Sequence, residues 1–259
     1  MSSLLCLLRQ SRVWLTLALS VMPMFSAQAA PLEIPNIVLV HGAFADGSSW
    51  AHVITLLQNR GYHVSAVQLP LTSLADDVAA TRRVIARQSG DVILVGHSWA
   101  GVVVTEAANM PAVKSIVYLS AMVPDSAESA AGMLQRLKSP MTGMQPDADG
   151  LIWMDDPSTF RTVMGADLSL ATATALAAVA KPIAARSFTD VLTHAAWHDK
   201  PTWYLITEDD QALPPVVQHQ LATQVRAQTM TLRSSHLSLV SHPREVADFI
   251  SRAVTSKKQ

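Results

Sequence analysis

The stretch LVGHSWAG, residues 94–101, joins two apolar segments of different character. The segment that leads into it, DVILV at 91–95, is short and rich in β-branched residues, which is typical of a strand buried on both faces. Ser98 stands in the turn that leads from this strand into a helix-like apolar run. Such a turn needs small neighbours, and it exposes the serine hydroxyl at the carboxyl end of the strand, where open α/β sheets bind ligands. The pattern G-x-S-x-A therefore predicts a nucleophile elbow in which Ala100 replaces the usual second glycine and Gly101 follows it; a helix N-cap serine is the alternative.

Strands and helices alternate regularly on both sides of this turn. Apolar runs predict six strands at 36–40, 63–69, 91–95, 115–119, 201–207 and 229–232. One-sided apolar stripes predict helices at 48–60, 73–89 and 99–110, and further helices that begin after 214 and at 243. This order predicts an α/β fold with a doubly wound, mostly parallel sheet.

The alternation stops between residues 124 and 200. We expect no strand there, and an Ala-rich piece at 168–180 predicts a helix. Long connections without strands inside one domain are usually functional, so this stretch predicts a helical cap inserted over the sheet.

The first 29 residues differ from the remainder. Arg9 and Arg12 precede an apolar stretch at 13–25, and the AQA at 27–29 fits the small-x-small cleavage pattern. The stretch is shorter than the roughly 20 residues that a membrane span needs. The sequence therefore predicts a signal peptide over residues 1–29 and one periplasmic or secreted domain over 30–259, with no stable membrane insertion after cleavage. An uncleaved anchor helix is the alternative.

Composition excludes several classes of function. The formal net charge of -1 provides no basic field for nucleic acid. The only cysteine, Cys6, lies in the predicted signal, so we expect no disulfide and no thiolate metal site. Neither a G-x-G-x-x-G nor a Walker pattern occurs, so no nucleotide cofactor is expected. His194 and His198 have helical i, i+4 spacing but lack the Glu of the H-E-x-x-H pattern, so no metal is expected.

A nucleophilic serine needs a base, and the base needs an acid that orients it. Three candidates for the acid, Glu208, Asp209 and Asp210, follow the predicted fifth strand, and His236 follows the sixth. The carboxyl ends of parallel strands share one edge of a sheet, so these residues are expected near Ser98. The order serine, acid, histidine is that of α/β hydrolases.

Five pieces of the chain resemble the α/β-hydrolase superfamily, in particular small bacterial serine esterases and the plant methylesterase and hydroxynitrile lyase group. They are LVHGAFADGSSW (39–50), LTSLADDVAATRRVI (71–85), LVGHSWAG (94–101), EDDQALPP (208–215) and SSHLSLVSHP (234–243).

The resemblance implies roles for individual residues. In such enzymes an Asp-x-x-x-Pro spacing follows the acid, and Asp210 with Pro214 fits it whereas Asp209 does not. The HGAF segment implies an oxyanion hole formed by the backbone N–H groups of Ala43 and Trp99. Its His41 is expected to brace the loop by hydrogen bonds.

Two further aromatic residues are candidates for the substrate pocket. Phe44 follows Ala43 in the same loop, and Trp197 stands near the end of the predicted cap. Packing in the core is the alternative for Phe44, and packing at the boundary between cap and sheet is the alternative for Trp197.

The sequence therefore predicts an exported, cofactor-independent hydrolase that cleaves a small-molecule carboxylic ester through an acyl-enzyme on Ser98. A cyanohydrin lyase is one alternative, although the related lyases carry a threonine at the position of Gly42 and a lysine at that of Leu237. A lactonase or amidase would use the same triad. A binding protein that has lost turnover is a third alternative.

Overall fold

A computed structural model of the chain describes residues 36–139 and 144–255. The predicted signal peptide at 1–29 lies outside these residues. Within the described ranges, every helix is too short or too polar to cross a membrane.

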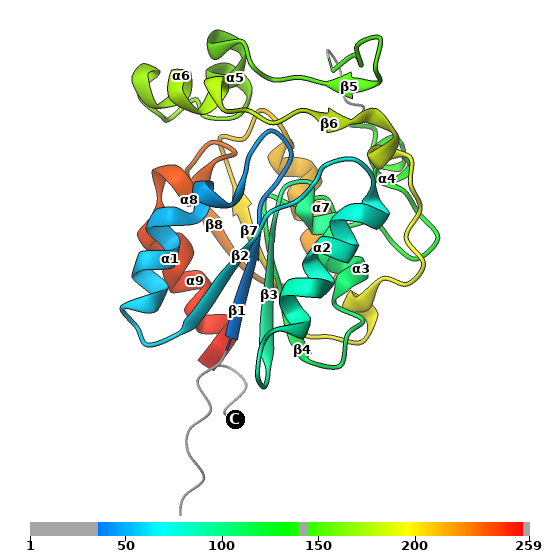
Figure 1. The fold of residues 1–259 in the computed structure, drawn as a ribbon, viewed down its shortest axis with the longest axis vertical. Coiled ribbons are helices and arrows are strands. Elements are labelled where there is room, and N and C mark those ends of the chain that lie inside the picture. The colour runs from blue at the N-terminus through cyan, green and yellow to red at the C-terminus, as the bar shows by residue number, and fades with distance from the viewer. Residues whose placement is uncertain (1–35, 140–143, 256–259) are drawn as a thin grey trace, which may run out of the picture. The chain divides into compact units, whose positions relative to one another are not determined.

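A six-stranded sheet forms the centre of the domain (Figure 1). Its strands are β1 (Asn36–Val40), β2 (His63–Val67), β3 (Val92–His97), β4 (Val113–Leu119), β7 (Thr202–Thr207) and β8 (Gln228–Leu232). They lie in the order β2-β1-β3-β4-β7-β8, and every neighbouring pair is parallel. The chain winds outward in both directions from β1 and β3, which confirms the predicted fold class. The direction changes between these two strands, and such a switch point is where open α/β sheets bind ligands.

Burial along the strands follows from their place in the sheet. All residues of β1, β3 and β7 are buried, as continuous apolar strands inside a parallel sheet require. The edge strands β2 and β8 are only partly buried.

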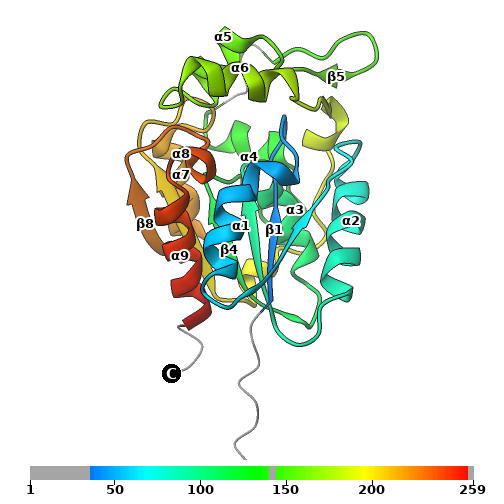
Figure 2. The ribbon, with the colours of Figure 1, turned by 60° about the vertical axis from the view of Figure 1, so that its left-hand side comes forward.

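Helices cover both faces of the sheet (Figure 2). On one side α1 (Ala51–Gln58) packs against α9 (Pro243–Thr255), and on the other α2 (Leu74–Ala86) packs against α3 (Ala100–Ala107). The remaining helices of the sheet layer are α7 (Pro215–Gln224), which packs on β7, and the short α8 (Ser238–Ser241). The helix predicted at 48–60 begins as a 3₁₀ helix, η1 (Gly47–Trp50), because Asp46 caps that turn by accepting the Ser48 N–H at 2.7 Å.

Most of the segment between β4 and β7 lies over the carboxyl ends of the strands, and its last part runs down beside α3 to the start of β7 (Figure 1). It contains α4 (Ala130–Arg136), β5 (Leu151–Ile152), α5 (Pro157–Val163), α6 (Leu170–Ala178), β6 (Ile183–Ala184) and the 3₁₀ helices η2 (Ala185–Phe188) and η3 (Ala196–His198). The expectation of no strand here is wrong, because β5 and β6 form an antiparallel pair. Each has two residues, which is too short to produce a periodic apolar pattern.

Candidate active site

The turn from β3 to α3 holds Ser98 in an unusual backbone conformation. Its φ of 55° lies in the left-handed region, which few residues other than glycine adopt. Gly101 packs against the segment that follows β4, where a Cβ would collide with the Met122 carbonyl oxygen and lie 2.7 Å from the Ala121 Cβ. Ala100 stands at the position where the elbow pattern usually has its second glycine. The glycine that the elbow needs is present one position later.

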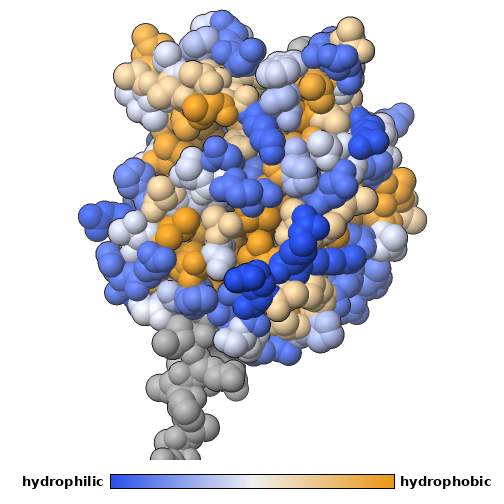
Figure 3. Space-filling view, in the orientation of Figure 1, coloured by the Kyte–Doolittle hydropathy of each residue, from blue (hydrophilic) through white to orange (hydrophobic). Residues whose placement is uncertain are grey.

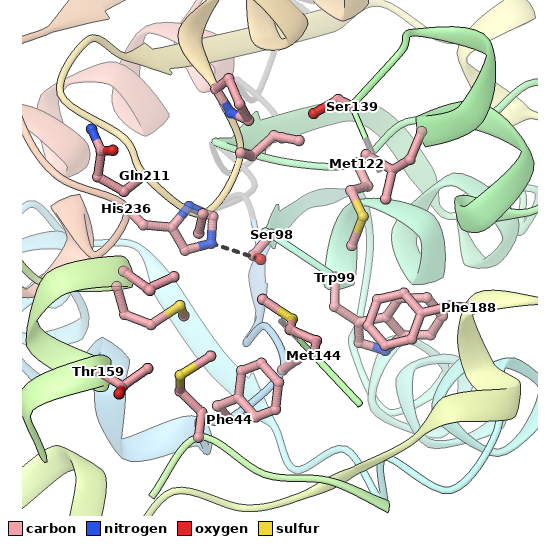
Figure 4. A pocket seen from close by; sticks show the side chains of 18 residues that line it. Phe44, Ser98, Trp99, Met122, Ser139, Met144, Thr159, Phe188, Gln211 and His236 are labelled. Atoms are coloured by element: carbon pink, nitrogen blue, oxygen red, sulfur yellow. Dashed lines mark hydrogen bonds between the residues drawn. The ribbon is translucent and has the colours of Figure 1, made fainter. Parts of the chain in front are cut away.

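Ser98, His236 and Asp210 form a hydrogen-bonded series at the carboxyl edge of the sheet. Figure 4 shows the bond between Ser98 and His236. The His236 Nε2 lies 2.7 Å from the Ser98 Oγ, and its Nδ1 lies 2.7 Å from the Asp210 Oδ2. The Asp210 carboxylate can only accept, so Nδ1 carries the ring proton. Nε2 is left with a free lone pair directed at the serine hydroxyl.

The Asp210 carboxylate is buried and heavily hydrogen-bonded. Its Oδ2 accepts from the Thr207 hydroxyl at 2.8 Å and the Gln218 amide at 2.9 Å, and its Oδ1 accepts from the Leu213 N–H at 2.9 Å. Burial alone would raise the pKa of Asp210. The adjacent His236 and these hydrogen bonds outweigh burial and lower the pKa, which keeps the carboxylate ionised.

The other two acidic candidates point elsewhere. Asp209 is exposed. The Glu208 carboxylate lies 3.1 Å from the His219 Nε2, on the surface. Of the three acids after β7, the structure brings only Asp210 to His236.

The loop after β1 lies against the elbow. A Cβ on Gly42 would lie 2.8 Å from the Ser98 Cβ, so only glycine permits this approach. Ala43 and Trp99 both line the cavity at Ser98. Among the described residues, neither backbone N–H has a hydrogen-bond acceptor. Two unpaired donors therefore lie beside the serine, on the residues that the resemblance indicated.

His41 fixes the position of this loop, as expected from the sequence. Its Nε2 accepts the Leu69 N–H at 3.0 Å, so its Nδ1 carries the proton and donates to the Gly42 carbonyl at 2.9 Å. Burial lowers the pKa of His41 to about 4. The ring is therefore neutral at neutral pH and acts as a brace.

Two buried residues that the sequence did not single out also support the site. The His97 Nε2 lies 2.9 Å from the His236 carbonyl oxygen, and burial lowers the pKa of His97 to about 3, so a neutral ring donates this bond. Asp77 accepts the Trp99 indole N–H at 2.8 Å and the Leu71 N–H at 2.7 Å. Burial raises the pKa of Asp77 to about 6. The sequence offered one signal for His97, since this residue stands directly before Ser98 at the end of a buried strand.

A cavity of about 400 Å³ lies between this edge and the cap (Figure 4). Its apolar lining residues are Ala43, Phe44, Trp99, Met122, Leu134, Met144, Met154, Val163, Met164, Phe188, Ala212, Leu213 and Pro214. Its polar lining residues are Ser98, Ser139, Thr159, Gln211 and His236. In the part of the chain that the structure describes, no Asp, Glu, Lys or Arg lines this cavity.

The two aromatic candidates for the pocket have different outcomes. Phe44 lines the cavity. The prediction for Trp197 is wrong, since this residue is absent from the described lining. Its ring stacks on His198 with 3.7 Å between centroids, and its indole N–H donates to the Pro124 carbonyl at 3.1 Å.

His194 and His198 do not share a helix, because only His198 belongs to η3. His194 lies 2.6 Å from Asp199, and His198 lies 2.7 Å from Asp125. Over residues 36–139 and 144–255, no group of three or more potential metal ligands is found.

Comparisons with known proteins agree with this fold. A family model described as the alpha/beta hydrolase family matches residues 37–249. The alpha/beta hydrolase nvfD of Aspergillus novofumigatus is 29% identical over 244 residues, which cover 85% of this chain and 96% of that protein.

Solved structures with the same fold include a methylesterase from Arabidopsis and a pyrethroid hydrolase from Sphingobium faniae. The first has a TM-score of 0.72 and 23% identity, covering 86% of this chain and 100% of its own. The second has a TM-score of 0.73 and 21% identity, covering 87% of this chain and 100% of its own. At these identities the likeness concerns the fold, and it confirms the resemblance to plant methylesterases.

Proposed function

Because this chain belongs to the α/β hydrolase family, we propose that it hydrolyses carboxylic esters through an acyl-enzyme formed on Ser98. The observation that carries the proposal is the series of two 2.7 Å hydrogen bonds that links Ser98 through His236 to the buried Asp210. The two unpaired backbone N–H groups beside the serine support it.

In the proposed acylation, the Ser98 Oγ attacks the ester carbonyl carbon while the His236 Nε2 takes the hydroxyl proton. The ionised Asp210 stabilises the imidazolium that results. The carbonyl oxygen becomes an oxyanion and accepts hydrogen bonds from the N–H groups of Ala43 and Trp99, each worth roughly 3 kcal/mol in the transition state. The tetrahedral intermediate then collapses, the bond to the alcohol oxygen breaks, and His236 returns its proton to that oxygen.

Deacylation repeats these steps with water. His236 takes a proton from a water molecule that attacks the acyl carbonyl, and the same two N–H groups stabilise the second oxyanion. When this intermediate collapses, the Ser98 oxygen leaves and recovers its proton from His236. The products are the carboxylic acid and the free enzyme.

The cavity lining favours an uncharged, largely apolar ester. Among the described residues it offers no charged side chain to pair with a charged substrate, and an unpaired charge is costly to remove from water. A volume of about 400 Å³ lies in the range of sites for drug-sized ligands. We therefore expect acyl or alcohol groups larger than those of an acetate.

The direct test is hydrolysis of p-nitrophenyl esters, from acetate to long acyl chains, by the wild type and Ser98→Ala. We expect turnover by the wild type, loss of turnover in the variant, and labelling of Ser98 by a fluorophosphonate. Absence of both turnover and labelling in the wild type would contradict an esterase. The same assay with lactones and amides as substrates distinguishes an esterase from a lactonase or an amidase.

The cyanohydrin lyase fits this site less well. The related lyases carry a threonine at the position of Gly42, where even a Cβ would lie 2.8 Å from the Ser98 Cβ. Cyanide release from mandelonitrile without ester hydrolysis would reverse this preference. A binding protein without turnover would show neither reaction.

We also propose that the protein is exported to the periplasm or the medium. The support is the basic start, the short apolar stretch and the AQA at 27–29. Mass spectrometry of the mature protein should find Ala30 as its N-terminus, whereas a mature chain that begins at Met1 would contradict export.

A further inference from the structure

A carboxylate of the cap contacts the loop that carries His236. Asp167 lies in the connection between α5 and α6. Its Oδ2 accepts the Ser235 N–H at 3.1 Å and the Ser234 hydroxyl at 3.1 Å, and its Oδ1 accepts a short hydrogen bond from the Ser235 hydroxyl. Both serines are buried. Asp167 of the cap therefore accepts three hydrogen bonds from the two residues just before His236.

The residue after His236 is bonded to the same part of the cap. The Leu237 N–H donates to the Met164 carbonyl at 3.1 Å. The loop is thus held by Met164 and Asp167 from the cap, while His97 holds the His236 carbonyl from the sheet at 2.9 Å. These contacts hold the backbone on both sides of His236, whose Nε2 lies 2.7 Å from the Ser98 Oγ.

The carboxylate form of Asp167 suits this task. Partial burial would raise its pKa, but the hydrogen bonds from Ser235 and its neighbours outweigh burial and lower the pKa. The imidazole of His242 faces it, with its Nδ1 3.6 Å from the Asp167 Oδ2. An ionised carboxylate accepts all three bonds at once, whereas a protonated one would have to donate at one oxygen.

We propose that Asp167 is a positioning residue that holds His236 in register with Ser98 from the cap. This inference rests on the proposed esterase function. Catalytic groups that are misplaced by about 1 Å can lose on the order of 100-fold in rate. Since the Met164 side chain lines the cavity, the segment that contacts substrate is also the segment that holds the catalytic histidine.

The test compares Asp167→Ala, Asp167→Asn and Ser235→Ala with Asp147→Asn. Asp147 is a matched control, because it is also a cap carboxylate with several hydrogen bonds, to the N–H groups of Asp149 and Leu151 and to the Trp153 indole. None of these donors belongs to the loop that carries His236. For each variant we would measure kcat and KM for p-nitrophenyl butyrate, the rate of fluorophosphonate labelling, and Tm.

We expect Asp167→Ala to lower kcat by about 30-fold with KM within about 2-fold of the wild type. Labelling should slow in parallel, because the reagent reports activation of Ser98. Asp167→Asn keeps one acceptor oxygen and should restore kcat to within about 3-fold of the wild type. Adding Ser235→Ala to Asp167→Ala should lower kcat by less than about 2-fold, because the two residues form one interaction.

A wild-type kcat and labelling rate in Asp167→Ala would overturn the proposal. An equal loss of kcat in Asp147→Asn would also overturn it. Additive losses of kcat in the variant that combines Asp167→Ala with Ser235→Ala would do the same. If Asp167→Ala does not fold, Ser235→Ala decides the question. A folded Ser235→Ala protein with the kcat and labelling rate of the wild type would overturn the proposal. The proposed function fails separately, if Ser98→Ala retains wild-type ester hydrolysis.

Discussion

The carboxyl edge of the sheet and the cap meet at one cavity but are built differently. At the sheet edge, Ser98, His236 and Asp210 are joined by 2.7 Å hydrogen bonds and follow the carboxyl ends of three parallel strands, β3, β8 and β7. The cap contributes flexible thioethers, including Met154 and Met164, to the opposite wall.

The exposure of apolar side chains in the cap also contrasts with the burial of the central strands. Leu170 of the cap is 64% exposed and Val179 is 62% exposed. Figure 3 shows apolar residues on the surface of the cap and also on the surface of the sheet layer. The core of the sheet is instead buried on both faces. We infer that the sheet edge sets whether the reaction occurs, and that the cap sets which ester is accepted.

The largest effect should come from breaking the series at its acid. Asp210→Asn presents His236 with an amide, which favours the wrong tautomer and removes the charge that stabilises the imidazolium. By analogy with the serine protease triad, we expect kcat to fall by about 10³-fold or more.

Asp209→Asn is the matched control, because Asp209 is the exposed neighbour. Its kcat for p-nitrophenyl butyrate should stay within about 2-fold of the wild type. A larger loss in Asp209→Asn than in Asp210→Asn would move the acid to the other residue.

The next largest effect should be a loss of stability in Gly101→Ala. The added Cβ meets the Met122 carbonyl oxygen, which belongs to backbone and cannot turn aside. We expect a loss of about 3 kcal/mol in the free energy of unfolding, measured by denaturant titration.

Gly132→Ala tests the same change in the cap helix α4. The nearest atom to its Cβ would be the Ser129 Oγ at 3.3 Å, which belongs to a side chain. The free energy of unfolding should change by less than about 1 kcal/mol. Equal destabilisation of both variants would contradict the difference in packing between the two regions.

Asp77→Asn should change how stability depends on pH. Folding raises the pKa of Asp77 from 3.8 to about 6, so the folded protein keeps this proton at pH values where the unfolded chain has lost it. Stability from this group therefore falls as pH rises from 3.8 to about 6, and the full penalty of about 3 kcal/mol remains above that range.

Between pH 5 and pH 8 the wild type should lose roughly 1.5 kcal/mol more unfolding free energy than Asp77→Asn. Denaturant titrations of both proteins at the two pH values measure this difference. Parallel pH dependence in the two proteins would show that Asp77 is not the buried acid that titrates.

The smallest effect should come from trimming the cap wall. Met154→Ala enlarges the cavity opposite the triad, so kcat/KM for p-nitrophenyl acetate should fall by about 5-fold while long acyl chains lose less. Leu170→Ala, at an exposed position of the same cap, should leave the chain-length profile unchanged. A uniform loss at all chain lengths in Met154→Ala would contradict a specificity role.

The same contrast explains what could be predicted from the sequence. Strands buried on both faces produce unbroken apolar runs, so the positions of Ser98 after β3 and Asp210 after β7 could be read directly. His236 follows the partly exposed edge strand β8, and the order serine, acid, histidine indicated its role. The hydrogen bond that His97 donates to His236 joins residues 139 positions apart, and the one that Asp77 accepts from Trp99 joins residues 22 positions apart. No local pattern encodes such pairs.

The cap was less predictable for a related reason. Its strands β5 and β6 are two residues long, and their pairing is decided by tertiary contacts. Trp197 could face either the cavity or the boundary, and stacking on His198 together with its bond to Pro124 decided the outcome.

The most direct test of the central claim is to trap the acyl-enzyme. The wild type would be mixed with p-nitrophenyl butyrate, quenched in acid within milliseconds, and digested for peptide mass spectrometry. We expect one butyryl group on the peptide that contains Ser98, and neither adduct nor turnover in Ser98→Ala. Unmodified Ser98 in the wild type, together with undiminished hydrolysis by Ser98→Ala, would contradict the account.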